Sequence, residues 1–97
     1  MVSIESIIDG LRLSGFSASR YRVARLIGVS EQTVKRWAEG DSVPSAKNAY
    51  KLKVLRECLR RRGDPVAWQI VSELKRGRQI RDVESVLKLA GLEWLSP

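Results

Sequence analysis

Residues 23–37 read VARLIGVSEQTVKRW, and Gly28 separates two short segments that carry apolar residues at helical spacing. Helices that cross steeply need a small residue where they touch, and Ala24 supplies it. The turn between them needs positive φ, which Gly28 adopts without steric cost, and Ser30 can cap the next helix. The residues that would line the contact are Val23, Ile27, Val29, Val34 and Trp37. The pattern predicts two helices joined by a tight turn, the arrangement of a helix-turn-helix unit.

The outward positions of these two helices are strongly polar. The helix predicted over 31–39 would expose four long polar side chains, and the preceding helix would add three arginines; they are Glu31, Gln32, Lys35 and Arg36, with Arg20, Arg22 and Arg25. A helix in the DNA major groove needs hydrogen-bonding side chains on its first turns, and its partner helix needs cations for phosphates. The alternative is an ordinary helical hairpin, whose solvated face more often mixes Glu and Lys in near balance. The composition favours DNA binding.

The rest of the chain also has helical periodicity, and no segment alternates convincingly with period two. Ser3 is predicted to cap a first helix that ends at Ser14-Gly15, and either Ser17 or Ser19 opens the second. Ser45 would cap a fourth helix, and Asp64-Pro65 combines a cap with proline at the first helical position. We therefore predict an all-α fold with helices over about 4–13, 18–27 or 20–27, 31–39, 46–62, 65–76 and 80–90.

The charge is unevenly distributed along the 97 residues, which carry a formal net charge of +7. Residues 1–30 have four basic and two acidic side chains, residues 31–62 have nine and four, and residues 63–97 have five of each. A basic protein of pI about 10.2 points to an anionic partner. The whole surplus lies in the first two thirds of the chain, so we expect the partner to bind there.

Several classes of protein are disfavoured by what the sequence lacks. Cys58 is the only cysteine, so no intrachain disulfide forms and a reducing, cytoplasmic setting is expected. There is no histidine, which removes histidine-based triads and the usual zinc sites. No apolar run approaches a membrane span, and no glycine-rich phosphate loop occurs. We expect neither an enzyme, nor a metal site, nor a cofactor.

The sequence resembles the Cro and phage-repressor (lambda-repressor-like) type of helix-turn-helix domain from Ile4 to about Leu59. The resemblance rests on A-x-x-x-G-V-S, beginning at Ala24, and on W-x-x-G-x-x-x-P, from Trp37 to Pro44. It implies a compact helical bundle that binds palindromic operators as a homodimer. An excisionase-like unit stays as an alternative. We predict a helix-turn-helix domain over 1–62 and a C-terminal extension of about two helices over 63–97.

The resemblance also implies roles for the polar positions. Base edges would be contacted by Glu31, Gln32, Lys35 and Arg36, and phosphates by Arg20, Arg22, Arg25, Ser30, Ser45 and Lys47. Gln32 suits adenine, and Lys35 or Arg36 suits guanine. Glu31 either accepts from the amino group of cytosine or stabilises the positive end of its helix. Lys51 is a further phosphate candidate.

Two features of the chain allow more than one interpretation. Arg60, Arg61 and Arg62 could form a nucleic-acid patch, but three cations in the last turn more often complement the helix dipole. The neutral extension could close the core or form a dimer contact; the residues proposed for that contact are Leu87, Leu92, Trp94 and Leu95.

These features together predict a sequence-specific regulator of double-stranded DNA, a repressor of phage, prophage or mobile-element origin that acts on the nucleoid. It would be controlled by its concentration, by operator competition or by a protein antagonist. One alternative is the antitoxin of a toxin–antitoxin pair, with the toxin bound by the extension. Another is a protein-interaction module that kept the fold and lost DNA binding.

Overall fold

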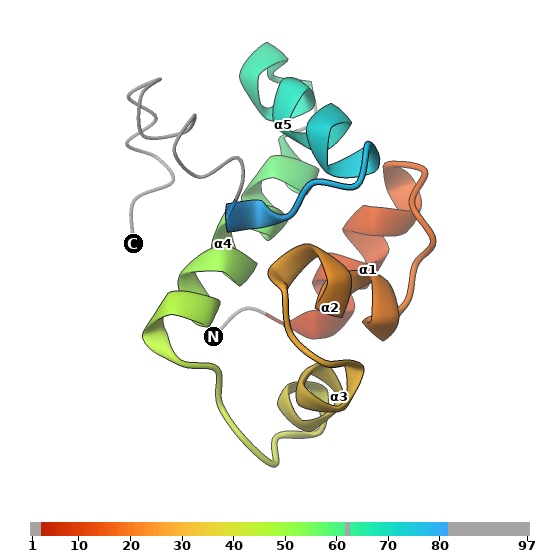
Figure 1. Ribbon diagram of the computed structural model, residues 1–97. Coiled ribbons are helices and arrows are strands. Elements are labelled where there is room, and N and C mark those ends of the chain that lie inside the picture. The colour runs from red at the N-terminus through yellow and green to blue at the C-terminus, as the bar shows by residue number, and fades with distance from the viewer. Residues whose placement is uncertain (1–2, 62, 82–97) are drawn as a thin grey trace.

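The computed structural model describes residues 3–61 and 63–81, and within these ranges the chain forms helices and no strand. The helices are α1 (Ile4–Leu13), α2 (Arg20–Ile27), α3 (Glu31–Glu39), α4 (Ala46–Arg60) and α5 (Pro65–Lys75). In Figure 1, α4 runs along the molecule between α3 at one end and α5 at the other. The prediction of an all-α helix-turn-helix bundle is confirmed.

Each helix begins at the residue that the sequence indicates. The side chains of Ser3, Ser19, Ser30 and Ser45 each accept a hydrogen bond from a backbone amide three residues on. The side chain of Asp64 accepts from the amides of Val66 and Ala67, and Pro65 occupies the first turn of α5. The fourth helix ends at Arg60 rather than at about residue 62, and α5 ends one residue earlier than predicted. Most of the predicted sixth helix, over 80–90, lies outside the described residues.

A single buried cluster joins all five helices. Helix α4 packs against α1, α2 and α5, while α2 packs against α3. The cluster takes its members from every helix and from the segment after α5; the largest fully buried ones are Ile7, Leu11, Ile27, Leu52, Leu55, Leu59, Leu74 and Ile80. Because α5 and Ile80 contribute to the same core, the first part of the extension covers the helical bundle.

Helix α5 is also attached to the turn that follows α1. The ammonium of Lys75 lies 5.7 Å from the centre of the Phe16 ring and 5.6 Å from that of Trp68. A cation over an aromatic face is attracted by the ring quadrupole. Phe16 packs against the core, as its position after the first helix predicts, and Trp68 is about half exposed. The contact with Phe16 therefore connects α5 to the segment between α1 and α2.

Candidate nucleic-acid interface

The turn between α2 and α3 has the predicted geometry. Gly28 has φ of +90°, and its amide donates to the carbonyl of Ala24 over 2.8 Å. Ala24 is 2% exposed, so it is the small residue at the helix contact. Val34 and Trp37 hold α3 against the body of the protein. The opposite face of α3 therefore points to solvent.

Two residues that are distant in the sequence, Lys51 and Gln79, contact the turn between α2 and α3. The ammonium of Lys51, on α4, donates to the carbonyl of Ile27 over 3.4 Å and is buried. It therefore stabilises the last turn of α2, where carbonyls lack helical partners, and it does not lie on the surface as a phosphate ligand would. A β-carbon placed on Gly28 would lie 3.1 Å from Oε1 of Gln79, so the segment after α5 also packs on this turn.

The four predicted base-reading residues are all exposed on α3. Glu31, Gln32 and Lys35 line a hollow of about 400 Å³ together with Arg20, from the start of α2. The structure thus places three base-reading candidates beside the leading phosphate candidate. Arg36 is exposed on the same helix outside this hollow.

Arg20 lies between two carboxylates that the sequence analysis did not include in the site. Its Nη2 is 3.8 Å from Oε1 of Glu5 on α1, and its Nη1 is 3.9 Å from Oε1 of Glu39 on α3. The three residues belong to different helices and are far apart in the sequence. No spacing rule within a single helix could have found this cluster, because it depends on how α1, α2 and α3 pack.

The remaining phosphate candidates differ in their exposure and in the hydrogen bonds that their side chains make within the protein. Arg25 and Lys47 are exposed, whereas Nε of Arg22 donates to Oγ of Ser17 over 3.1 Å. Ser30 and Ser45 use their hydroxyl oxygens to cap α3 and α4. The hydroxyl of Ser30 also shares a hydrogen bond of 2.8 Å with that of Thr33. A capping hydroxyl accepts through its oxygen, so the proton of Ser45 remains compatible with a phosphate contact.

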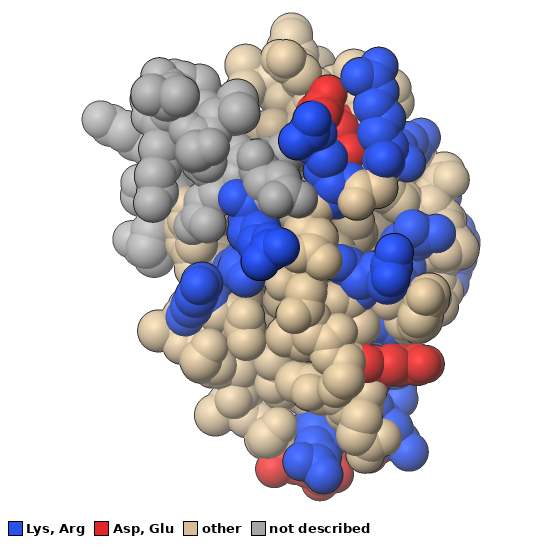
Figure 2. Space-filling view, in the orientation of Figure 1, with Lys and Arg blue, Asp and Glu red and all other residues tan. Residues whose placement is uncertain are grey.

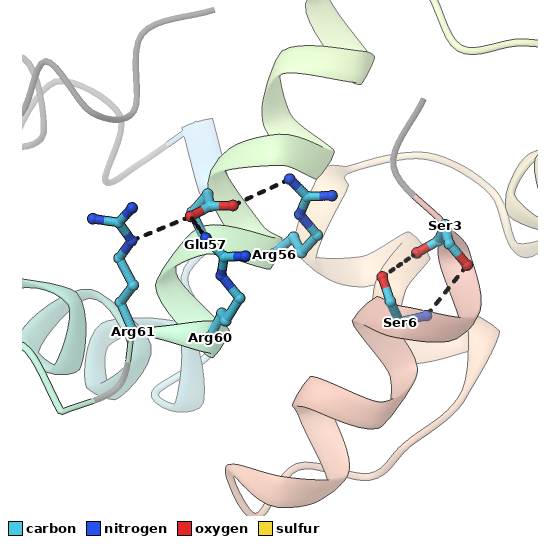
Figure 3. A network of polar contacts seen from close by, with 6 residues as sticks. All are labelled: Ser3, Ser6, Arg56, Glu57, Arg60 and Arg61. Carbon is cyan, nitrogen blue, oxygen red and sulfur yellow. Dashed lines mark hydrogen bonds and ion pairs between the residues drawn. The ribbon is translucent and has the colours of Figure 1, made fainter.

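The arginines near the end of α4 surround one carboxylate (Figure 3). Arg56 and Arg60 each donate to Glu57 over 3.1 Å, and Nε of Arg61 lies 3.2 Å from the same carboxylate. Burial alone would raise the pKa of Glu57, but the hydrogen bond from Arg56 and the charges of Arg60, Arg56 and Arg61 outweigh it and lower the pKa. Arg60 and Arg61 thus take part in ion pairs with Glu57, a structural role that differs from the helix-dipole effect expected from the sequence. Arg62 lies outside the described residues.

The free cysteine of the described residues, Cys58, is buried. Burial, with the charges of Glu57 and Asp64, raises the pKa of the Cys58 thiol to about 12, so this buried thiol stays protonated. Among residues 3–61 and 63–81, no three His, Cys, Asp or Glu side chains gather as metal ligands would. Within the same ranges, no helix has the length and apolar character needed to cross a membrane.

The basic character of the surface agrees with an anionic partner. Figure 2 shows lysine and arginine side chains spread over one face from the α5 end to the α3 end, with fewer acidic side chains between them.

The dimer contact predicted for the extension involves residues outside the described ranges, so it stays a prediction. These residues are Leu87, Leu92, Trp94 and Leu95.

A family model described as helix-turn-helix, of the Cro and phage-repressor type, matches residues 17–52. The matched segment runs from before α2 through α3 and into α4, and so contains the turn and the hollow. Neither the curated proteins nor the solved structures with which the chain was compared gave a match.

Proposed function

We propose, from the premise that residues 17–52 form a helix-turn-helix of the Cro and phage-repressor type, that this protein is a sequence-specific regulator that inserts α3 into the DNA major groove. The match supports DNA binding by this segment. The observation that carries the proposal is the hollow where Arg20 meets Glu31, Gln32 and Lys35. It combines a cation for the phosphate backbone with side chains able to read bases.

Base reading is assigned to the exposed face of α3. Gln32 can form a bidentate pair with adenine, and Lys35 or Arg36 can pair with guanine. Each such pair contributes about 1–3 kcal/mol of discrimination against the wrong base. Val34 and Trp37 anchor the helix on its other face, which fixes the side of α3 from which these side chains project.

We further propose that the protein is a repressor of phage, prophage or mobile-element origin that acts on the nucleoid as a homodimer. A single recognition helix reads only a few base pairs, and two helices spaced about 34–36 Å apart would read a palindrome. An antitoxin would use the same DNA-binding face and hold a toxin with residues 63–97. A toxin gene next to this one is the observation that would favour that alternative.

The proposed function is tested by selecting bound sites from random duplex DNA with the full-length protein. We expect a recurring sequence, palindromic if the protein is a dimer. Gln32→Ala should then reduce the preference for one base position by about 1–3 kcal/mol and leave the salt dependence unchanged. Gln69→Ala, at an exposed position on α5, is the matched control. Equal binding to the selected site and to shuffled DNA would show that α3 does not read bases.

The dimer contact is tested separately, with the complete chain. Leu92→Ser with Trp94→Ser should shift sedimentation from dimer to monomer if the extension carries the contact. Removing the whole extension is less informative, because Ile70, Val71 and Leu74 are part of the core. An unchanged dimer in the double variant would exclude these two residues from the interface.

A further inference from the structure

The guanidinium of Arg20 is attracted by the carboxylates of Glu5 and Glu39 at distances too long for hydrogen bonds. Its distances of 3.8 Å to Glu5 and 3.9 Å to Glu39 exceed the range of about 2.7–3.2 Å for N–H···O hydrogen bonds. The two carboxylates attract different nitrogens of the guanidinium, one from the side of α1 and one from the side of α3. The N–H groups of Arg20 are therefore oriented by the protein and remain available to a stronger acceptor.

The three side chains are open enough for such an exchange. The side chain of Arg20 is 37% exposed, and those of Glu5 and Glu39 are 69% and 45% exposed. Ion pairs between exposed groups contribute little because water screens them. A phosphate oxygen that approaches the hollow can therefore displace either carboxylate from Arg20. Each carboxylate also repels the phosphate directly, as an exposed carboxylate elsewhere on the surface would.

Resting on the proposed function, we infer that Glu5 and Glu39 set the strength of sequence-independent DNA binding by competing with phosphate for Arg20. The competition occurs at the backbone contact, which is the same for every sequence. It lowers the affinity for selected and random DNA by the same factor and leaves base reading by α3 unaltered. Both affinities are consequently lower than they would be with glutamine at positions 5 and 39.

The test measures binding of full-length variants to a random-sequence duplex and to a selected site at fixed salt. Glu5→Gln and Glu39→Gln should each raise the affinity for both duplexes roughly two- to fivefold, the effect of an exposed ion pair. Asp9→Asn is the matched control. Asp9 is on α1, is 66% exposed and pairs with Arg12, so its loss changes the net charge equally at another place.

A second set of variants establishes whether the effect passes through Arg20. In an Arg20→Gln background, Glu5→Gln and Glu39→Gln should increase the affinity no more than Asp9→Asn does. The inference is overturned if the two glutamate variants match Asp9→Asn in the wild-type background, or if their full effect persists without Arg20. Wild-type protein that binds no duplex at low salt would instead overturn the proposed function.

Discussion

Two charged clusters in this protein have inverse compositions. In the first, one arginine, Arg20, lies between two exposed carboxylates at 3.8 and 3.9 Å. In the second, one carboxylate, Glu57, is contacted by three arginines at 3.1–3.2 Å and is only 7% exposed. The first joins α1, α2 and α3 beside the hollow, whereas the second forms within α4 and at its C-terminal end.

The difference between the clusters separates a binding role from a structural role. A buried carboxylate has lost its water and depends on its partners, so removing either side is costly. An exposed arginine with loosely placed partners keeps its hydration and can exchange ligands. The Glu57 cluster should therefore affect folding, and the Arg20 cluster should affect DNA binding.

The largest effect is expected for Glu57→Gln. The substitution leaves three arginines facing an uncharged amide, and the free energy of unfolding should fall by about 2 kcal/mol, less than for a fully buried pair because the arginines are partly exposed. Urea unfolding at pH 7, followed by tryptophan fluorescence, measures the change. Glu73→Gln, at a more exposed carboxylate that pairs with Arg76 and Arg78, is the control and should lose less. Equal losses in the two variants would contradict the structural role assigned to Glu57.

The Glu57 cluster should also make the free energy of unfolding depend on pH, by a smaller amount than the loss caused by Glu57→Gln at pH 7. The folded protein lowers the pKa of Glu57 below its ordinary value of 4.5, so its stabilisation is complete above that value. As the pH falls below 4.5 and through the folded pKa, the stabilisation is lost. The difference in unfolding free energy between wild type and Glu57→Gln should therefore be constant from pH 7 to about 5.5 and shrink in acid. A difference that stays constant down to pH 3 would contradict this assignment.

Arg20→Gln should change binding more than stability. One lost phosphate contact should reduce DNA affinity by about 1 kcal/mol near 0.1 M salt and flatten the plot of log affinity against log salt by about 0.9. The free energy of unfolding should change by less than about 0.5 kcal/mol. Arg12→Gln removes the same charge from an exposed arginine on α1. The phosphate role fails if the two variants weaken binding equally.

The smallest effect is expected for Arg60→Gln. The side chain of Arg60 is 65% exposed, and Arg56 and Arg61 still contact Glu57 when it is removed. The loss of unfolding free energy should be at most about 0.5 kcal/mol in the same urea experiment. A loss above about 1 kcal/mol would show that Glu57 requires all three cations.

Local features of the fold could be predicted because they depend on neighbouring residues. The cap at Ser30, the positive φ at Gly28 and the outward face of α3 all follow from residues within a few positions of each other. The sequence allows Ser17 and Ser19 as alternative caps of α2, and the structure has Ser19. Each involves one helix end or one helix face, where spacing and residue type determine the geometry. The confirmed helix-turn-helix fold rests on these features.

Contacts between distant residues could not be predicted in the same way. The spacing of charges on the fourth helix does not reveal that Lys51 reaches the carbonyl of Ile27 and is buried. The approach of Glu5 and Glu39 to Arg20 depends on the angles at which three helices cross. Such angles result from the packing of the whole core, which a one-dimensional pattern does not specify.

The packing of Gln79 on Gly28 has a consequence for how this sequence can diverge. The glycine is restricted by its backbone conformation and also by an amide oxygen that would lie 3.1 Å from any β-carbon. Asparagine tolerates positive φ better than most residues, so it is the replacement the backbone admits most easily. Because that oxygen ends a flexible side chain, the amide of Gln79 needs to move by only a few tenths of an ångström to admit a β-carbon. The backbone conformation at Gly28 therefore limits substitution there more strongly than the contact with the extension does.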